Sequence, residues 1–347
     1  MTAFLSEFFR GDLEKNLKFL FAPLVSDWYA RLVATLEVRD LNVSFGKVAV
    51  LRGVNLSVDA GQTLGIVGES GCGKSMTGLA ILGMLPPTAT VNSGEILLEG
   101  KNLVGQPESD WLKIRGEVIA MVMQDPFTSL NPMMRVGDQV AEVYVLHQSA
   151  SWKEGRTMAV EMLEKVGIPS PNVAARKFPH QMSGGQRQRV VIACAFAARP
   201  KVLIADEPTT ALDVTLQAQI LHLLRQLQAE TGTATIVVSH DIGVIGSVAD
   251  KVSVFYAGRV VEEGETADVL TTPAHPYTQA LLSALPRRGQ DRLEQILGQP
   301  PRFDSMPKGC SFSPRCKLAG PQCETAPESR EVEAGHLAAC WKAGAPV

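Results

Sequence analysis

The chain has 347 residues, of which 45% are apolar and 20% are charged, and these values exclude wholesale disorder. Lys and Arg number 33 and Asp and Glu 36, so the net charge of -3 argues against nucleic acid as the main partner. Six cysteines are too few for a disulfide scaffold.

The first 33 residues form an amphipathic pattern. Phe and Leu recur at helical spacing from Phe4 to Phe21, and Pro23 is expected to end the helix. Three interpretations stay open: a helix that packs on the protein body or on a partner subunit, a helix on a membrane surface, or a poorly specified leader. The N-terminus has no early Lys or Arg, so it does not resemble a secretory signal. No stretch of the chain approaches the ~18 apolar residues that a membrane span needs.

From residue 36 onward the pattern predicts an α/β domain. Apolar residues alternate over 36–45 and 54–58, as in half-buried strands, and Leu64–Val67 is a short apolar run that enters a glycine-rich loop. Farther along, strands and helices alternate, which indicates a largely parallel sheet. The expected order is strands in 36–67, a helix and strands in 76–123, mostly helices in 124–200, strands at 202–205, 234–238 and 252–256 with a helix at 216–229, a hairpin strand at 260–261, and an appendage rich in Pro, Gly and Cys in 273–347.

The glycine-rich loop fits the phosphate-binding pattern G-x-x-x-x-G-K-[ST], with an apolar strand before it and a helix after it. Its glycines let backbone N–H groups wrap around phosphate oxygens, and the helix dipole favours negative charge there. Lys74 is expected to supply a cation to the β- and γ-phosphates, and Ser75 a hydroxyl ligand for Mg²⁺. The predicted nucleotide-binding residues of this loop are Gly68, Glu69, Ser70, Gly71, Cys72, Gly73, Lys74, Ser75 and Met76.

A pair of carboxylates follows the apolar run at 202–205, at Asp206 and Glu207. Two acids at the end of a buried strand need a purpose, because unpaired buried charge is costly. Asp206 is expected to hold Mg²⁺, and Glu207 to polarise the attacking water as a general base. Together with the loop, this pair predicts an ATP-hydrolysing site.

A second cluster of backbone N–H groups is expected where Ser183 precedes a helix, an arrangement that suits a γ-phosphate. With Met182 before it, this stretch resembles the signature motif of ABC-type ATPases, in which Leu is commoner at the first position. The resemblance covers about residues 35–345. It implies a P-loop ATPase fold with an antiparallel β subdomain and a helical subdomain. It also implies that two such domains meet head to tail, so that each ATP lies between one P-loop and the opposite signature. The signature residues are Ser183, Gly184, Gly185 and Gln186.

Four further positions match motifs of that family, and their roles follow from the resemblance. Phe45 resembles the aromatic residue that stacks on adenine, with an ordinary core Phe as the competing interpretation. Gln124 resembles the Q-loop glutamine, which contacts Mg²⁺ and links the site to membrane subunits. Asp213, after Ala211, resembles the D-loop, which crosses the dimer interface. His240 resembles the switch histidine, which contacts the γ-phosphate. The expected catalytic residues are Glu207, His240 and Gln124, and the expected Mg²⁺ ligands are Ser75, Gln124 and Asp206.

Two stretches narrow the resemblance to the dipeptide, oligopeptide and nickel importer branch: Gln124–Pro132 and Ala274–Leu282. Within this branch the chain is most similar to the D-type ATPase. The branch implies a heterodimer with a paralogous ATPase, two membrane permeases and, indirectly, an extracytoplasmic solute-binding protein. It places the chain peripherally at the cytoplasmic face of the bacterial inner membrane. The solute is left open between dipeptides, oligopeptides, nickel or metal chelates, and opines or sugars.

Four of the six cysteines lie in the last 38 residues, in a Pro-rich segment with few core residues. Such a segment in a reducing compartment suggests a metal as the cross-link. The paired C-x₂₋₄-C knuckles of structural zinc are absent, and the wider spacing favours a cubane cluster in which each cysteine takes a separate iron. The family resemblance also associates this tail with an iron–sulfur cluster. We therefore expect a [4Fe–4S] cluster, with zinc or free thiols as alternatives, at Cys310, Cys316, Cys323 and Cys340.

The expected domains are an amphipathic N-terminal extension over 1–33, an ABC ATPase domain over 34–272 with a helical subdomain at about 125–190, and a C-terminal extension over 273–347. The expected function is that of an ATP-hydrolysing, energy-coupling subunit of a bacterial ABC importer. The alternative is a soluble ABC ATPase outside transport, but such proteins commonly carry two cassettes or a coiled-coil insertion. A subunit that binds ATP without hydrolysing it is disfavoured because Glu207 and His240 are both present.

Overall fold

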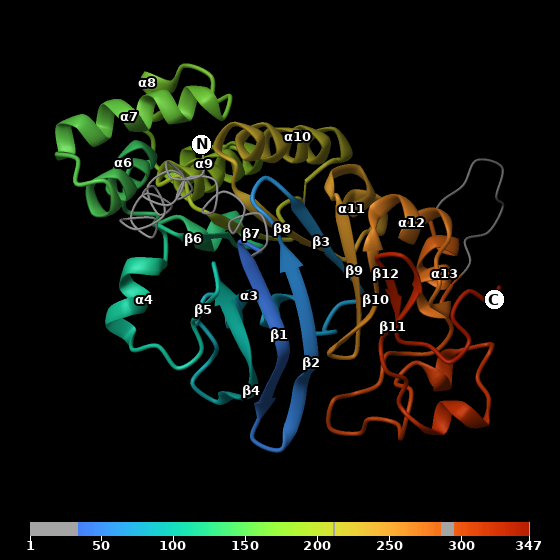
Figure 1. Cartoon of the computed structure of the whole chain (residues 1–347). Coiled ribbons are helices and arrows are strands. Elements are labelled where there is room, and N and C mark those ends of the chain that lie inside the picture. The colour runs from blue at the N-terminus through green and yellow to red at the C-terminus, as the bar shows by residue number, and fades with distance from the viewer. Residues whose placement is uncertain (1–33, 211, 286–294, 347) are drawn as a thin grey trace, which may run out of the picture.

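Two β-sheets organise the chain in this computed structural model, which describes residues 34–210, 212–285 and 295–346 (Figure 1). The amphipathic N-terminal extension predicted over 1–33 and Ala211 of the predicted D-loop lie outside the described residues. The first sheet is antiparallel, in the order β2-β1-β4-β5, and its strands are β1 (Leu36–Phe45), β2 (Val48–Val58), β4 (Ala89–Leu98) and β5 (Lys101–Asn102).

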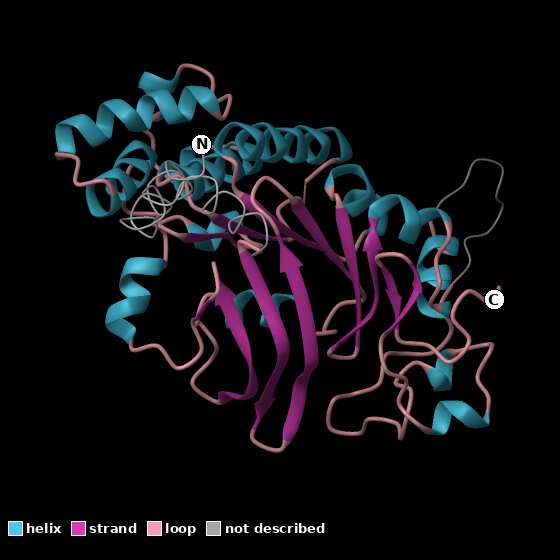
Figure 2. Cartoon of the chain, viewed as in Figure 1, coloured by secondary structure: helices cyan, strands magenta, loops and turns pink. Residues whose placement is uncertain are grey.

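The second sheet has eight strands in the order β11-β12-β10-β9-β3-β8-β7-β6. Its five strands from β9 to β6 run parallel, as the alternation of strands and helices predicts, and the others are antiparallel (Figure 2). Its members are β3 (Thr63–Val67), β6 (Ile119–Val122), β7 (Val202–Asp206), β8 (Ala234–Ser239), β9 (Lys251–Tyr256), β10 (Arg259–Glu265), β11 (Arg330–Glu333) and β12 (His336–Ala338).

Within the described residues, six α-helices outside the helical lobe accompany the two sheets, and α3, which follows β3, carries Lys74 and Ser75. The α/β fold class expected from the sequence is confirmed, and the helix predicted at 216–229 is longer than expected at both ends because Asp213 caps its start and Gly232, with φ 69°, ends it. These helices are α3 (Lys74–Ile81), α4 (Glu108–Ile114), α10 (Val214–Thr231), α11 (Ile242–Val248), α12 (Thr266–Thr271) and α13 (Pro276–Ser283).

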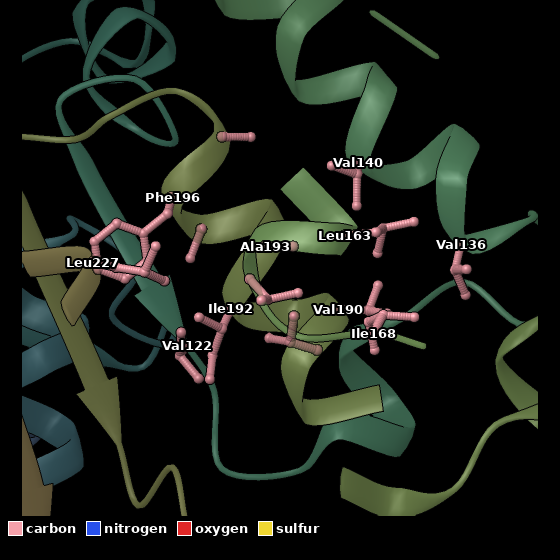
Figure 3. Packing of buried hydrophobic residues seen from close by; sticks show 14 of the residues in the cluster. Val122, Val136, Val140, Leu163, Ile168, Val190, Ile192, Ala193, Phe196 and Leu227 are labelled. Atoms are coloured by element: carbon pink, nitrogen blue, oxygen red, sulfur yellow. The ribbon is translucent and has the colours of Figure 1, made fainter. Parts of the chain in front are cut away.

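A helical lobe lies between β6 and β7 in the sequence and, in Figure 1, on the opposite side of the sheets from the C-terminal extension. Its helices pack around one apolar cluster that includes Val140, Leu163 and Phe196, each at most 1% exposed (Figure 3). The cluster also reaches Val122 of β6 and Leu227 of α10, so the lobe is anchored to the parallel sheet. The lobe consists of α5 (Pro126–Ser129), α6 (Val136–His147), α7 (Trp152–Lys165), α8 (Pro171–Ala174), η1 (Pro179–Gln181) and α9 (Gly184–Ala197).

The C-terminal extension continues the eight-stranded sheet. β12 pairs antiparallel with β10, and β11 pairs with β12. The buried carboxylate of Glu262 accepts hydrogen bonds from the backbone N–H groups of Ala274 (2.6 Å) and His275 (2.9 Å) and contacts His336 Nε2 at 2.7 Å. One polar group therefore joins β10 to the start of α13 and to β12. The remaining turns of the extension are η2 (Ser313–Arg315) and η3 (Pro321–Glu324).

Among the described residues, no helix combines the length and the apolar character that a bilayer crossing requires.

Candidate functional site

The glycine-rich loop joins β3 to α3 at the carboxyl ends of the parallel strands, as the motif predicts. All five residues of β3 are buried between β8 and β9, which fixes where the loop starts. A Cβ at Gly68 would lie 2.2 Å from the backbone oxygen of Phe255, and Gly73 has φ 109° just before α3. Only glycine fits either position, so the loop can bend closely over a phosphate.

Lys74 and Ser75 open α3; Lys74 points its ammonium into the loop, and Ser75 points its hydroxyl toward β7. The ammonium of Lys74 is buried and donates to the backbone oxygens of Gly68 (2.7 Å) and Glu69 (3.0 Å). The hydroxyl of Ser75 donates to Asp206 Oδ1 at 3.1 Å, across 131 positions of sequence. Two oxygen groups of the kind that Mg²⁺ prefers therefore lie side by side, which fits the ion expected there.

Glu207 follows β7 and is the convergence point of the site. Its Oε2 accepts hydrogen bonds from Gln124 Nε2 (2.9 Å) and Thr210 Oγ1 (2.8 Å), and its Oε1 lies 3.3 Å from His240 Nδ1. Its backbone adopts φ 46°, a conformation that non-glycine residues rarely take and that clusters at functional sites. The structure thus brings together the three residues that the sequence predicts as catalytic.

The two neighbouring carboxylates have different electrostatic surroundings. Burial raises the pKa of Asp206, and the hydrogen bond from Ser75 offsets only part of this effect. Burial acts in the same direction on Glu207, but the hydrogen bonds from Thr210 and His240 outweigh it, so the pKa of Glu207 is lowered. Glu207 is therefore an ionised acceptor with fixed orientation, which a general base for water requires.

The signature residues lie on the helical lobe. Ser183 caps α9: its hydroxyl accepts from the N–H of Gln186 at 3.3 Å, and its own N–H donates to Gln186 Oε1 at 3.2 Å. Gly185 is closely packed, because a Cβ there would lie 2.4 Å from Leu216. Within the described part of the chain, no hydrogen bond joins 183–186 to the loop at 68–75, and α9 and α3 belong to different apolar clusters.

The two other predicted nucleotide contacts lie at element ends. Phe45 ends β1, is partly exposed, and pairs with Val48 across the β1–β2 hairpin. The same sheet reaches the loop, because a Cβ at Gly73 would lie 2.9 Å from Leu51 of β2. Asp213 is exposed and caps α10, where its carboxylate accepts from the N–H of Leu216 at 2.9 Å.

The four tail cysteines line one pocket, together with His275 and Phe312. Burial raises the pKa of three of these thiols, and neighbouring thiols contribute to each shift. Within the described ranges, however, no three His, Cys, Asp or Glu side chains converge closely enough to hold a single metal ion. Among the described residues, the four thiols therefore share a pocket without forming a ready metal site. The cysteines are Cys310, Cys316, Cys323 and Cys340.

A cavity of about 400 Å³ lies between the helical lobe and the sheet. Its wall includes Met121 and Met123 at the end of β6, directly before Gln124, and Gln139 and Val143 of α6. Met123 and Phe127 nearby are exposed, at 48% and 62%. Apolar surface at the start of the Q-loop is thus accessible from outside.

Two contacts of the site were not predicted from the sequence. Thr210 holds Glu207, and its place three residues downstream is the only local signal of this contact. Arg315 of the C-terminal extension forms an ion pair with Glu69 of the phosphate loop, 246 positions away. No local pattern signals a contact of this sequence separation.

Known families match this chain in two places. The ABC transporter family matches residues 51–210, and the oligopeptide/dipeptide transporter C-terminal region matches residues 261–323. The oligopeptide transport ATP-binding protein OppD of Bacillus subtilis is 48% identical over 320 residues, covering 90% of this chain and 89% of that one. OppD of Escherichia coli is 47% identical over 316 residues, covering 89% and 93%.

Solved structures agree with these matches. The cbiO1 protein of Clostridium perfringens, part of the ABC transporter complex cbiONQ, has 32% identity and a TM-score of 0.61, covering 68% of this chain and 90% of that one. The ATP-binding cassette MJ0796, a dimer bound to ADP and Pi after hydrolysis, has 29% identity and a TM-score of 0.59, covering 67% and 98%. The chain therefore belongs to the ATP-hydrolysing ABC transporter ATPases, in the group that carries the oligopeptide/dipeptide C-terminal region.

Proposed function

We propose that the chain is the energy-coupling ATPase subunit of a bacterial importer for peptides or related small solutes. The observation that carries the proposal is the convergence of Gln124, Thr210 and His240 on Glu207, next to the Ser75–Asp206 pair. The oligopeptide/dipeptide region in residues 261–323 supports the solute class. Relatives that are 45–48% identical are named as oligopeptide and dipeptide transport ATP-binding proteins.

In this mechanism, the backbone N–H groups of the phosphate loop receive the phosphates, and Lys74 supplies a cation to them. Mg²⁺, when bound, neutralises phosphate charge, and Ser75, Gln124 and Asp206 are the residues that would hold it. Glu207 accepts a proton from the attacking water, and His240 holds the γ-phosphate side of the site. The remaining predicted contacts are Phe45 to adenine and Gly68, Ser70, Gly71, Cys72, Gly73 and Met76 around the phosphates.

The site is completed by a second ATPase domain. Ser183 is exposed at the first turn of α9, where backbone N–H groups lack helical partners and favour an anion. These groups would bind the terminal phosphate of ATP held by the partner, and Asp213 would lie in the dimer interface. The branch resemblance indicates that the partner is a paralogous ATPase rather than a second copy.

Coupling to transport would occur at the cavity beside Gln124. Its exposed apolar residues fit cytoplasmic helices of two permeases, and Gln124 links that surface to Glu207. ATP bound by two surfaces only in the closed dimer shifts the equilibrium toward closure, and hydrolysis reverses it. The chain would thus act at the cytoplasmic face of the inner membrane, and the solute would contact the permeases and a solute-binding protein.

The four cysteines would bind a [4Fe–4S] cluster that cross-links the C-terminal extension. Support comes from the pocket that the four cysteines share and from the family resemblance, which associates this tail with an iron–sulfur cluster. The test is anaerobic purification followed by iron and zinc analysis. About four irons per chain are expected, and stoichiometric zinc without iron would reject the cluster.

The transport proposal is tested by reconstituting the chain with its permeases, partner ATPase and solute-binding protein in vesicles. Uptake of short peptides should stimulate ATP hydrolysis, and Gln124→Ala should uncouple the two while ATP binding remains. Gln106→Ala serves as the control, because this partly exposed glutamine lies just after β5 and donates to the backbone oxygen of Asn102 at 2.9 Å. ATP hydrolysis that no solute or permease alters would contradict the proposal.

A further inference from the structure

We propose that Arg315 of the C-terminal extension is a positioning residue of the ATP site. It holds the Glu69 carboxylate and thereby fixes the shape of the phosphate loop. The proposal rests on the assignment of residues 68–75 as the phosphate site. It adds to that assignment a residue outside the ATPase core, in the segment that carries the cysteines.

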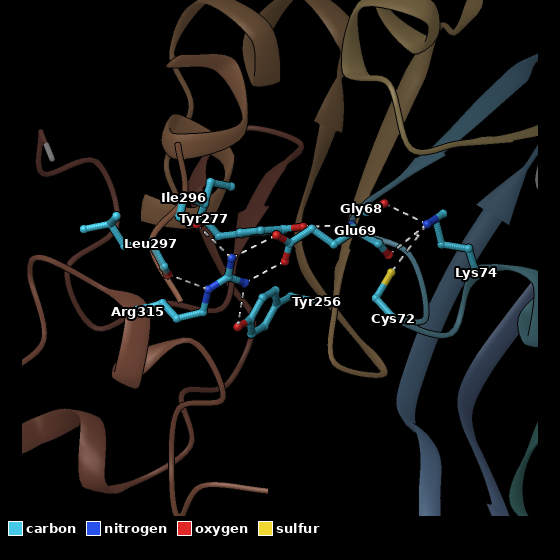
Figure 4. A network of polar contacts seen from close by, with 9 residues as sticks. All are labelled: Gly68, Glu69, Cys72, Lys74, Tyr256, Tyr277, Ile296, Leu297 and Arg315. Carbon is cyan, nitrogen blue, oxygen red and sulfur yellow. Dashed lines mark hydrogen bonds and ion pairs between the residues drawn. The ribbon is translucent and has the colours of Figure 1, made fainter. Parts of the chain in front are cut away.

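The contact between Arg315 and Glu69 is a two-pronged ion pair. Arg315 Nη1 donates to Glu69 Oε2 at 2.6 Å, and Nη2 donates to Glu69 Oε1 at 2.9 Å (Figure 4). The side chain of Arg315 is only 4% exposed, and that of Glu69 is 25% exposed. Paired N–H groups on a carboxylate in this geometry give both strength and a fixed orientation, and burial limits screening by salt.

The guanidinium of Arg315 is itself held on every side. Its Nε donates to the backbone oxygen of Leu297 at 3.0 Å, Nη2 contacts the oxygen of Ile296 at 3.4 Å, and Nη1 lies 3.3 Å from the Tyr256 hydroxyl. Figure 4 shows these partners around one side chain. Because the donors of Arg315 also have partners within the extension and β9, its two terminal nitrogens, the fork of the guanidinium, face Glu69 in one orientation only.

The extension also holds the backbone of Glu69. The N–H of Glu69 donates to the hydroxyl of Tyr277 at 2.9 Å, and Tyr277 is fully buried on α13. On the other side, the oxygen of Glu69 accepts from Lys74, the lysine of the phosphate loop. Glu69 therefore lies between the extension and Lys74, and any shift of its side chain changes the loop that receives the phosphates.

The expected effect is on affinity more than on turnover. The loop contains glycines at 68, 71 and 73, which are conformationally permissive, so an unsupported loop loses more freedom when it binds a nucleotide. Because Arg315 holds Glu69 before ATP binds, the loop has already lost part of that conformational freedom, and ATP binding has to restrict it less. Glu207, Gln124 and His240 do not contact Arg315, so the chemical step at saturating ATP should continue.

The test uses the full-length chain and Arg315→Gln, with Arg315→Lys as the conservative variant. Dissociation constants are measured with a fluorescent ATP analogue, and KM and kcat are measured in the assembled complex. Arg315→Gln should weaken ATP binding about tenfold, which corresponds to about 1.4 kcal/mol, and leave kcat within about twofold. Arg315→Lys, which keeps the charge without the fork, should lie between this variant and wild type. Arg302→Gln, an 81% exposed arginine of the same extension, is the control and should bind ATP normally.

A double-mutant cycle with Glu69→Gln separates this role from a purely structural one. If Arg315 acts through Glu69, the double variant should bind ATP no more weakly than the worse single variant. Additive losses would overturn the proposal, as would a lowered melting temperature with unchanged ATP affinity in both single variants. Lys74→Ala is measured in parallel. If it binds ATP normally, the assignment of the phosphate site fails, and this outcome is distinct from a failure of Arg315 alone.

Discussion

Replacing Glu207 by Gln tests the centre of the site, because the change removes a charge and a proton acceptor while keeping the size of the side chain. The carboxylate accepts hydrogen bonds from Gln124 and Thr210 on one oxygen and contacts His240 on the other. The introduced amide can turn its oxygen toward Gln124 and Thr210 and its NH₂ group toward His240 Nδ1. We therefore expect the local structure to survive, with a loss of only about 1 kcal/mol in stability.

Catalysis should respond far more strongly than stability. Removing a general base typically costs 10²- to 10⁴-fold in rate, or about 3–5 kcal/mol of activation free energy. Single-turnover hydrolysis of ATP by the assembled complex measures this rate, and size-exclusion chromatography with ATP measures dimer formation. We expect hydrolysis to fall by this factor while ATP binding persists and the closed dimer accumulates.

The control is Glu37→Gln, which removes a carboxylate that pairs with Arg39 on β1, away from the phosphate loop. Its hydrolysis rate should equal that of wild type. Turnover of Glu207→Gln within about threefold of wild type would refute the reasoning, because the carboxylate would then not be the base. A loss of ATP affinity as large as the loss of rate would equally refute it, because Glu207 would then act in binding.

Three further changes test other parts of the structure. Lys74→Ala should abolish detectable ATP binding, measured by equilibrium binding on the purified chain, because the loop then has no ammonium for the phosphates; normal affinity would remove Lys74 from the site. Asp206→Asn should raise the melting temperature of the nucleotide-free chain at pH 7. Burial raises the pKa of Asp206 in the folded state, so the ionised carboxylate destabilises the fold at pH values above the folded-state pKa. The advantage of the variant should disappear as the pH falls below the unfolded-state pKa of about 3.9, where the carboxyl is protonated in both states. A pH-independent difference in thermal melts between pH 3 and 7 would contradict this assignment. Glu262→Ala should lower the free energy of unfolding by about 3–5 kcal/mol in urea titrations. The change leaves the N–H groups of Ala274 and His275 and the ring of His336 without their buried acceptor. A loss below about 1 kcal/mol would show that water replaces the carboxylate.

Local sequence signals predicted most of the parallel sheet and its site residues. The apolar run before Gly68, the carboxylates after 202–205 and the Ser–Gly start of α9 each have a short-range chemical reason, and the structure places them at the ends of β3 and β7 and at the start of α9. The meeting of Gln124 with Glu207 is different, because Gln124 carried a role only through the family resemblance and its contact with Glu207 spans 83 positions of sequence.

The extension was least predictable. β11 and β12 have four and three residues, with the polar sequence REVE in one and His336 in the other, so neither shows the alternation that indicates a strand. They form because the edge of β10 offers unpaired backbone groups. The Arg315–Glu69 pair depends on the same docking, so the charges of the two residues alone could not reveal it.

The pairing of β12 with β10 bears on how this protein can be divided. A fragment that stopped at residue 272, the predicted end of the ATPase core, would leave the outer side of β10 without its neighbour and would remove Ala274, His275 and His336 from the carboxylate of Glu262. Open strand edges of this kind recruit other chains, so such a fragment should self-associate where the intact polypeptide does not. Truncation at that position would therefore report on aggregation before it reported on the role of the tail.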